Sequence, residues 1–454
     1  MIPILIFAAA IATQAPQDTT RLTVATAVDR ALATHPSVAA ARAQRDVAAA
    51  EVGQARAAWL PALSLDGAIN RFELPMVVYP LHSLDLRNPP EFDRSLSQAS
   101  VGAAYTLLDF GARRSKVKAA EAGREAASAT LDASEQQMVA RTANAYLRVL
   151  TSRGVLAAQD ERIAALAAEL KRSRDRLAVG KAARVDTMRA AAELASAAAE
   201  RISSASSLDV AERDLARLTG VPVSGAPLAD VRLTAAGDAN PVVDCPAAPS
   251  AAAPAACAAA ADRAIAASPD VRVASLRYDA ADAAVGAARS ALFPSLQATS
   301  AIVDRSNITG RYLAEWQVGV ALSYPLFTGG ARESSLGRAE AAARAAQHQR
   351  QLAQLNALQQ EDEASAALTG ARARVVALDA AVQQSAEVAR ITALARDVGE
   401  GTQTDYLIAE ANLFRARSNL VQARNAVIAA RVELARVQGE LSRAWIARSL
   451  ESLP

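Results

Sequence analysis

Two long stretches of this chain carry apolar residues at every seventh position. Residues 113–179 and 332–398 are each 67 residues long, and neither contains a proline. The apolar columns are Val149, Leu156, Ile163 and Leu170 in the first stretch and Leu368, Val375, Val382 and Ala389 in the second. A seven-residue period is typical of helices that supercoil with their neighbours. The pattern predicts two unbroken helices, each about 100 Å long at the α-helical rise.

Each long stretch ends at a Val-Gly step, after which the chain returns as a second helical segment. The steps are Val179-Gly180 and Val398-Gly399, and a glycine just past the last turn is a common helix stop. The returning segments, 182–220 and 402–443, correspond to each other at an offset of 219 residues. A repeat of this kind predicts one body built from two equivalent parts. The two parts are residues 16–220 and 262–443.

In both repeats a helical segment leads to a proline and then to an alternating segment. The first helical segment, 23–59, stops before Pro61, and its counterpart stops before Pro294. Proline breaks a helix and permits an extended chain to follow. Within 61–109 and 294–327 apolar and polar residues alternate, and segments of about ten such residues are the signature of outer-membrane barrel strands. We therefore expect a strand hairpin in each repeat, within a mainly α-helical fold with four strands per chain.

Aromatic residues concentrate at these predicted hairpins. Eleven of the 17 aromatic residues lie in or beside them, which favours a membrane-interface girdle, where Tyr and Trp are enriched. Tyr105 and Tyr324 occupy equivalent positions near the ends that face the long helices, and Trp316 lies within the second hairpin. The alternative is that these rings pack inside a small soluble sheet.

The segments outside the repeats suggest export. Residues 1–15 contain an apolar block followed by Ala-x-Ala-like sites, as in a secretory signal, although no Lys or Arg precedes the block. The linker 221–261 is rich in Pro and Ala and holds Cys245 and Cys257. In an exported protein two cysteines suggest one disulfide, with two free thiols as the alternative. Residues 444–454 read as a C-terminal tail.

Charge and composition argue against several functions. The chain has 49 basic and 47 acidic residues in mixed order, so no basic surface for nucleic acid is visible. Apolar residues make up 52% but aromatic residues only 4%, which fits long packed helices better than a thick globular core. The three histidines are scattered, and no phosphate-binding glycine loop or nucleophile–base pair can be recognised. We therefore expect no enzyme activity, no cofactor and no metal.

The order of elements resembles the TolC family of outer-membrane efflux proteins over nearly the whole chain after the signal. Its most specific parts are Leu177-x-Val179-Gly180-x(5)-Asp186 and Val398-Gly399-x(5)-Asp405-x-Leu407, together with the two helix-Pro-strand junctions. The resemblance implies a homotrimer in which each protomer contributes four strands to a shared twelve-stranded β-barrel. The helices would form an α-barrel across the periplasm. Physical reasoning agrees in part, because four strands cannot enclose a lumen and an open sheet edge cannot face lipid.

The resemblance also implies the function and the partners. The protein would be the outer-membrane exit duct of a tripartite efflux or type I secretion system. It would passively conduct substrates from an inner-membrane pump, with a periplasmic adaptor bound at Val179, Gly180, Val398 and Gly399. These residues could instead serve only as turns. A soluble periplasmic scaffold or an adaptor without a pore is the alternative function, although two strand-bearing repeats fit neither well.

The gate at the helix tips departs from the family pattern. Asp405 and Asp186 correspond to gate aspartates, whereas the second ring position falls on Ile408. The positions of a gate tyrosine and a gate arginine fall on Arg396 and Gly401. The resemblance thus implies a partial gate network and closure through other contacts. For the two aspartates, capping of the following helix is an equally good explanation.

Overall fold

The computed structural model covers the whole chain, and the description applies to residues 21–78, 87, 92–181, 183–235, 262–307 and 312–453. The expected signal, 1–15, and the pair Cys245 and Cys257 lie outside these residues and stay predictions. Among the described helices, none is both long enough and apolar enough to cross a membrane.

Two compact units make up the chain. The helical unit comprises residues 1–38, 135–260 and 360–454, and the sheet unit comprises residues 39–134 and 261–359. Two long helices contribute residues to both units. They are α3 (Ala112–Ala178) and α8 (Ala331–Val398), which contain 67 and 68 residues. Both begin and end within one residue of the stretches predicted from the heptad pattern.

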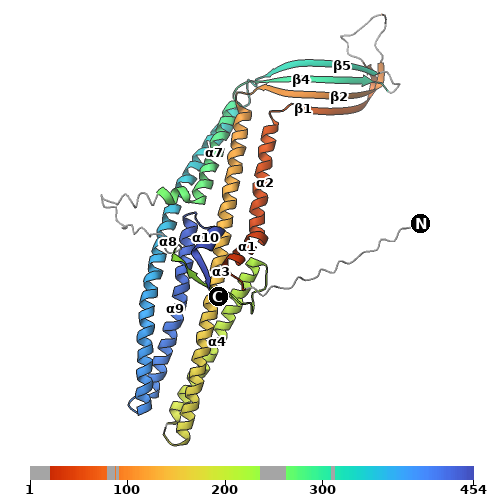
Figure 1. Cartoon of the computed structure of the whole chain (residues 1–454). Coiled ribbons are helices and arrows are strands. Elements are labelled where there is room, and N and C mark those ends of the chain that lie inside the picture. The colour runs from red at the N-terminus through yellow and green to blue at the C-terminus, as the bar shows by residue number, and fades with distance from the viewer. Residues whose placement is uncertain are drawn as a thin grey trace, which may run out of the picture. The chain divides into compact units, whose positions relative to one another are not determined.

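The sheet unit contains one antiparallel four-stranded sheet (Figure 1). Its order is β1-β2-β4-β5, so each predicted hairpin forms and the two hairpins pair through β2 and β4. The outer edges of β1 and β5 have no partner strand in the described chain. The strands are β1 (Ala62–Val77), β2 (Phe92–Leu108), β4 (Ser295–Ser306) and β5 (Tyr312–Ser323). All are longer than the 9–11 residues, roughly, that a transmembrane strand needs.

The helical segment predicted over 23–59 is broken into two helices, α1 (Val24–Thr34) and α2 (Pro36–Ala57). Pro36 causes the break, since it lacks the N–H that would continue the α1 hydrogen bonds. Helix α7 (Pro269–Ser290) in the second repeat likewise starts at a proline, with Ser268 as its N-cap. The corresponding prolines of the two repeats therefore act as helix starts.

The helical unit is built from two hairpins. Helix α3 turns into α4 (Arg184–Thr219), and α8 turns into α9 (Gln403–Val437), as the yellow and blue pairs of Figure 1 show. Val149 and Leu368 from the predicted columns are fully buried. The two hairpins share a core of Leu166, Ala197, Tyr406 and Leu407. Arg201 interrupts the α4 column, and its guanidinium pairs with Asp160 of α3 instead of packing into the seam.

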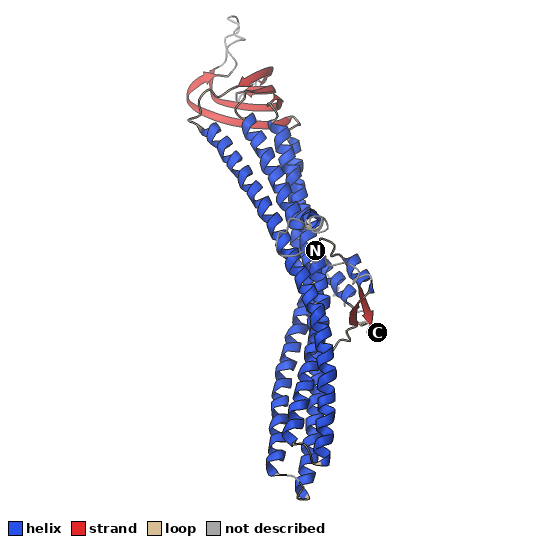
Figure 2. Ribbon diagram, turned by 90° about the vertical axis from the view of Figure 1, so that its left-hand side faces the viewer, coloured by secondary structure: helices blue, strands red, loops and turns tan. Residues whose placement is uncertain are grey.

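A small folded element lies where we expected only a linker and a tail. Within 221–261 the chain forms β3 (Asp230–Leu233), and within 444–454 it forms most of α10 (Arg443–Ser449) and β6 (Leu450–Leu453). Strands β3 and β6 pair antiparallel and lie on the flank of the helices of this unit (Figure 2). Four-residue strands are too short to produce a detectable alternation, which explains why the sequence pattern missed them.

Buried side chains fasten this element to α3. Trp445 and Ile446 enter the same core as Val24 of α1. The buried hydroxyl of Tyr146 is placed to donate to the carbonyl oxygens of Leu22, at 2.6 Å, and Ala229, at 2.7 Å. Burial raises the pKa of Tyr146 far above its usual value, so this donor keeps its proton.

Candidate functional sites: the hairpin turns and the exposed sheet face

The two Val-Gly turns have the same backbone shape. Gly180 and Gly399 adopt φ angles of 73° and 86°, in the left-handed region that favours glycine. An added Cβ at either position would meet no atom within 4 Å, so the requirement for glycine is conformational and not steric. Val179 and Val398 are 67% and 72% exposed. The turn geometry explains the glycines, and the exposed valines leave an apolar surface free at each turn.

The two candidate gate aspartates have different surroundings. Asp405 forms a capping box with Thr402: the Thr402 hydroxyl accepts from the Asp405 N–H at 3.1 Å and donates to the Asp405 carboxylate at 2.7 Å. Asp186 lies in the first turn of α4, and its nearest cation is Arg189 at 4.0 Å. The N-cap of α4 is Ala183, which offers no side-chain cap. The capping role therefore describes Asp405 but not Asp186.

Arg396 lies at the centre of a buried polar cluster. Its Nη1 donates to the Glu169 carboxylate at 2.7 Å, and both side chains are 4% exposed. Its Nε and Nη2 donate to Asp397 at 3.1 and 2.8 Å. Its guanidinium lies 4.1 Å from the ring centroid of Tyr406, within cation–π range. Gln403 Nε2 donates to Glu169 at 3.0 Å. We call Arg396, Glu169, Gln403 and Tyr406 the Arg396 cluster.

The Arg396 cluster joins the two hairpins. Glu169 belongs to α3, Arg396 to α8, and Gln403 and Tyr406 to α9. Nearby, Arg189 of α4 donates to the Thr404 hydroxyl of α9 at 2.7 Å. Sequence reasoning selected Arg396 by position but missed Glu169. That carboxylate directly precedes Leu170 of the apolar column, a place where the heptad pattern predicts a solvated charge.

Two groups of this cluster have raised pKa values, Arg396 and Tyr406. Burial alone would lower the pKa of Arg396, but the hydrogen bond with Asp397 and the charge of Glu169 raise it instead. Burial also raises the pKa of Tyr406. The guanidinium therefore stays charged and the phenol stays neutral. Removing either Arg396 or Glu169 would leave the other charge buried and unpaired. Such a change lowers the free energy of unfolding by about 3–5 kcal/mol.

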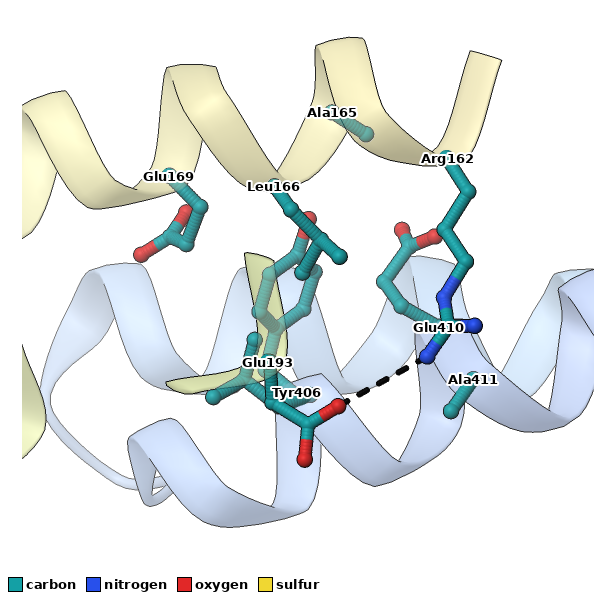
Figure 3. A pocket seen from close by; sticks show the side chains of 9 residues that line it. Arg162, Ala165, Leu166, Glu169, Glu193, Tyr406, Glu410 and Ala411 are labelled. Atoms are coloured by element: carbon teal, nitrogen blue, oxygen red, sulfur yellow. Dashed lines mark ion pairs between the residues drawn. The ribbon is translucent and has the colours of Figure 1, made fainter. Parts of the chain in front are cut away.

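The space beside the cluster is too small for a substrate. Figure 3 shows Arg162, Glu169, Glu193, Tyr406 and Glu410 converging on a cavity of about 10 Å³, which accommodates about one water molecule. The ion pair drawn there joins Arg162 and Glu193 at 3.6 Å. The contacts between the hairpins at this level therefore hold helices together and do not form a pocket for a ligand.

One face of the sheet exposes a continuous apolar surface. Register pairing places one apolar residue of each strand in a single row, and these residues are between 54% and 80% exposed. The row consists of Leu65, Val101, Ile302 and Trp316. On the opposite face Arg305 and Glu315 form an ion pair at 3.1 Å. The sheet thus has one apolar and one polar face, as the alternation predicted.

The two tyrosines predicted to belong to a membrane girdle lie at the helix-side ends of the strands, each beside an arginine. The guanidinium of Arg113 is 5.7 Å from the Tyr105 ring centroid, and that of Arg332 is 5.5 Å from the Tyr324 ring centroid. The structure therefore places Tyr105 and Tyr324 beside equivalent arginines of the two repeats, while Trp316 lies within β5 on the apolar face.

Comparison with known proteins agrees with these features. The family model described as "Outer membrane efflux protein" matches residues 27–221 and 260–440. Nodulation protein T of Rhizobium leguminosarum bv. trifolii is 24% identical over 377 residues, which cover 81% of this chain and 75% of that protein. The outer membrane protein VceC of Vibrio cholerae superposes with a TM-score of 0.76 at 22% identity, over 92% of this chain and 96% of that one. The MtrE outer membrane channel of Neisseria gonorrhoeae gives 0.73 at 23% identity, over 92% and 90%.

The architecture is that of a channel protein with an outer-membrane sheet and long periplasmic helices. The chain belongs to the outer membrane efflux protein family. It is an outer-membrane protein whose class serves as the exit duct of efflux systems, and the scaffold alternative is not favoured. Family and fold are those of channels, not of enzymes.

Proposed function

We propose that three copies of this chain close their sheets into one barrel and conduct substrates passively out of the cell. The observation that carries the proposal is the row of exposed apolar residues across a sheet whose two edges are unpaired in the described chain. An apolar face of this size is unfavourable in water, and an unpaired edge is unfavourable in lipid. Pairing β5 of one copy with β1 of the next satisfies the edges, and a closed barrel can then place the apolar face against lipid. The number three rests on the family resemblance.

In this proposal the pump and the adaptor deliver the substrate at the hairpin turns. Val179 and Val398, each exposed beside a left-handed glycine, would be the apolar contacts of the periplasmic adaptor. An inner-membrane pump would supply the driving force, because a passive duct needs no catalysis of its own. Replacing Val398 by Asp should weaken cross-linking to the adaptor while trimers persist. Unchanged cross-linking would restrict these residues to forming turns.

The Arg396 cluster would hold the tip closed. Asp405 is engaged with the start of its own helix, so it is less suited to a ring of contacts between helices. The buried pair of Arg396 and Glu169 instead ties the α8–α9 turn to α3. We therefore assign the closing contact to this pair, with Asp186 as a weaker contributor through its partner Arg189.

A charge on the apolar face tests the membrane assignment. Val320→Arg, midway between Trp316 and Tyr324 on the apolar face, should cost about 2–4 kcal/mol per chain and lower the amount of detergent-extracted trimer. The matched control is Gln317→Arg, which places the same charge on the polar face of the same strand. The control should assemble normally and shift single-channel ion selectivity towards anions. Equal yields of the two variant trimers would exclude a lipid-facing role for the Trp316 face.

A further inference from the structure

The two repeats differ at the junction between the sheet and the long helices. In the first repeat Arg113 donates through Nε to the Asp109 carboxylate at 2.9 Å, and its guanidinium stacks on Trp59 at 4.4 Å. The equivalent arginine of the second repeat, at the offset of 219, is Arg332, and the residue equivalent to Asp109 is Thr328. The second repeat therefore keeps the cation and lacks the carboxylate.

Among the described residues, the loss leaves Arg332 without a neutralising carboxylate. Its Nη2 donates to the carbonyl oxygen of Pro325 at 2.5 Å, but Nε and Nη1 have no acceptor among the described residues. Buried N–H groups without an acceptor are costly, most of all on a charged group. An acceptor that carries negative charge is therefore missing at this position.

The surroundings of Arg332 indicate where that acceptor comes from. Tyr324 directly follows β5 and continues the alternation of Trp316, Val318, Val320 and Leu322, so it belongs to the apolar face. Leu326 and Phe327, which follow it, are among the most exposed apolar residues of the chain. The cation thus lies where the apolar face ends and the periplasmic helix begins. In a bilayer this is the level of the headgroups.

We propose that Arg332 binds the phosphate diester of a glycerophospholipid in the inner leaflet of the outer membrane. This inference rests on the proposed outer-membrane assembly. The phosphate supplies the anionic acceptor, while the acyl chains lie on the apolar face beside Tyr324. The Tyr324 ring lies 5.5 Å from the guanidinium and is itself 48% exposed, and in this proposal the ring turns aside when the phosphate reaches the N–H donors. Arg113 also leaves its Nη1 without an acceptor among the described residues, but its charge is neutralised by Asp109, so we expect one such phosphate per protomer, at Arg332.

Native mass spectrometry of the full-length trimer in detergent tests the proposal. The probes are dioleoylphosphatidylglycerol and dioleoylglycerol, which carries the same chains without the phosphate. The wild-type protein should retain the phospholipid and not dioleoylglycerol. Arg332→Gln should reduce retention roughly tenfold, as expected for the loss of one charge-assisted contact. The matched control, Arg338→Gln, removes an exposed charge from the same helix, further from the sheet, and should change retention less than about twofold.

A second variant separates lipid binding from a purely structural role. Thr328→Asp installs the carboxylate of the first repeat without touching Arg332, and it should abolish the preference for phospholipid as strongly as Arg332→Gln. If Arg332 only supports the fold, Thr328→Asp stabilises the trimer and leaves lipid retention unchanged, which overturns the proposal. Binding of inorganic phosphate alone, equal in strength to that of the lipid, overturns the lipid assignment as well.

A failure of the lipid site can be distinguished from a failure of the proposed duct. Channel conductance is recorded on the same wild-type and Arg332→Gln preparations. If both proteins form conducting trimers and retain the phospholipid equally, the lipid site is contradicted and the proposed duct is not. A wild-type protein that neither assembles nor conducts contradicts the duct itself.

Discussion

The two hairpin turns share a sequence motif and a backbone shape but differ in how they are fastened. Helix α9 starts with a capping box and buries 14 residues along its length, whereas α4 starts at an uncapped Ala183 and buries six. The buried pair of Arg396 and Glu169 joins both hairpins but lies closer to the α8–α9 turn, because Arg396 is in the last turn of α8 whereas Glu169 is further from the end of α3. Both turns carry the Val-Gly-x(5)-Asp motif and have the same backbone shape, so the motif accounts for the turn. The contacts of the surrounding side chains account for the difference in stability that we expect between the two turns.

Removing the guanidinium of Arg396 should have the largest effect on this difference. Arg396→Met leaves the Glu169 carboxylate buried without its main partner, so the α8–α9 tip should lose about 3–5 kcal/mol of local stability. Hydrogen exchange at the amides of residues 395–407 measures the change. The double variant Arg396→Met, Glu169→Met removes both charges and should recover most of the loss. A double variant as unstable as the single one would mean that the ion pair is not the fastening contact.

Substitution of the two turn glycines should have the next largest effect. The loss of stability should be the same at both turns. Gly180→Ala and Gly399→Ala each place a Cβ in the left-handed region, at a cost of about 1–2 kcal/mol, with no steric clash to add. Thermal unfolding of the detergent-solubilised trimer, compared between the two variants, provides the measurement. A much larger loss for Gly399 would show that the turns differ in backbone strain as well as in side-chain contacts.

Helix capping should have a smaller and asymmetric effect. Thr402→Ala removes the capping box of α9 and should destabilise its first turn by about 1 kcal/mol. Hydrogen exchange within the first turn of α9 reports the change. Mutation of Asp186 to Asn should leave α4 almost unchanged, because its carboxylate makes only the 4.0 Å contact with Arg189. If hydrogen-exchange protection fell equally in Thr402→Ala and Asp186→Asn, the start of α4 would depend on Asp186 as much as the start of α9 depends on its capping box.

Adding a cap to the first hairpin should have the smallest effect. Ala183→Ser supplies the hydroxyl that α4 lacks and should stabilise its start by about 0.5–1 kcal/mol. Slower hydrogen exchange in the first turn of α4 is the expected result. Unchanged exchange would indicate that something other than the missing cap loosens this turn.

The long-range pattern of the sequence was sufficient for the fold class and for the strand hairpins. Heptads and alternation are periodic over many residues, so they located α3 and α8 to within one residue. The break at Pro36 could have been found, because the proline was visible and has a counterpart in Pro269. The β3–β6 pair could not, since its strands are four residues long and far apart in sequence.

The side-chain roles at the tip were harder to predict than the turns themselves. Asp405 was recognised by position, and only its contact with Thr402 shows that it caps α9. Glu169 was overlooked because burial depends on how α3 meets α8 and α9, which a single helical pattern does not contain. Motif spacing determines backbone geometry, whereas partners across helices depend on packing.

Single-channel conductance in planar bilayers tests the central claim most directly. The account predicts that the wild-type protein produces discrete steps of low conductance, that Arg396→Met raises the step size several-fold, and that the exposed-charge control Arg338→Gln leaves it unchanged. Absence of discrete steps from the wild-type protein, or an Arg396→Met trace identical to that of the wild type, would contradict it.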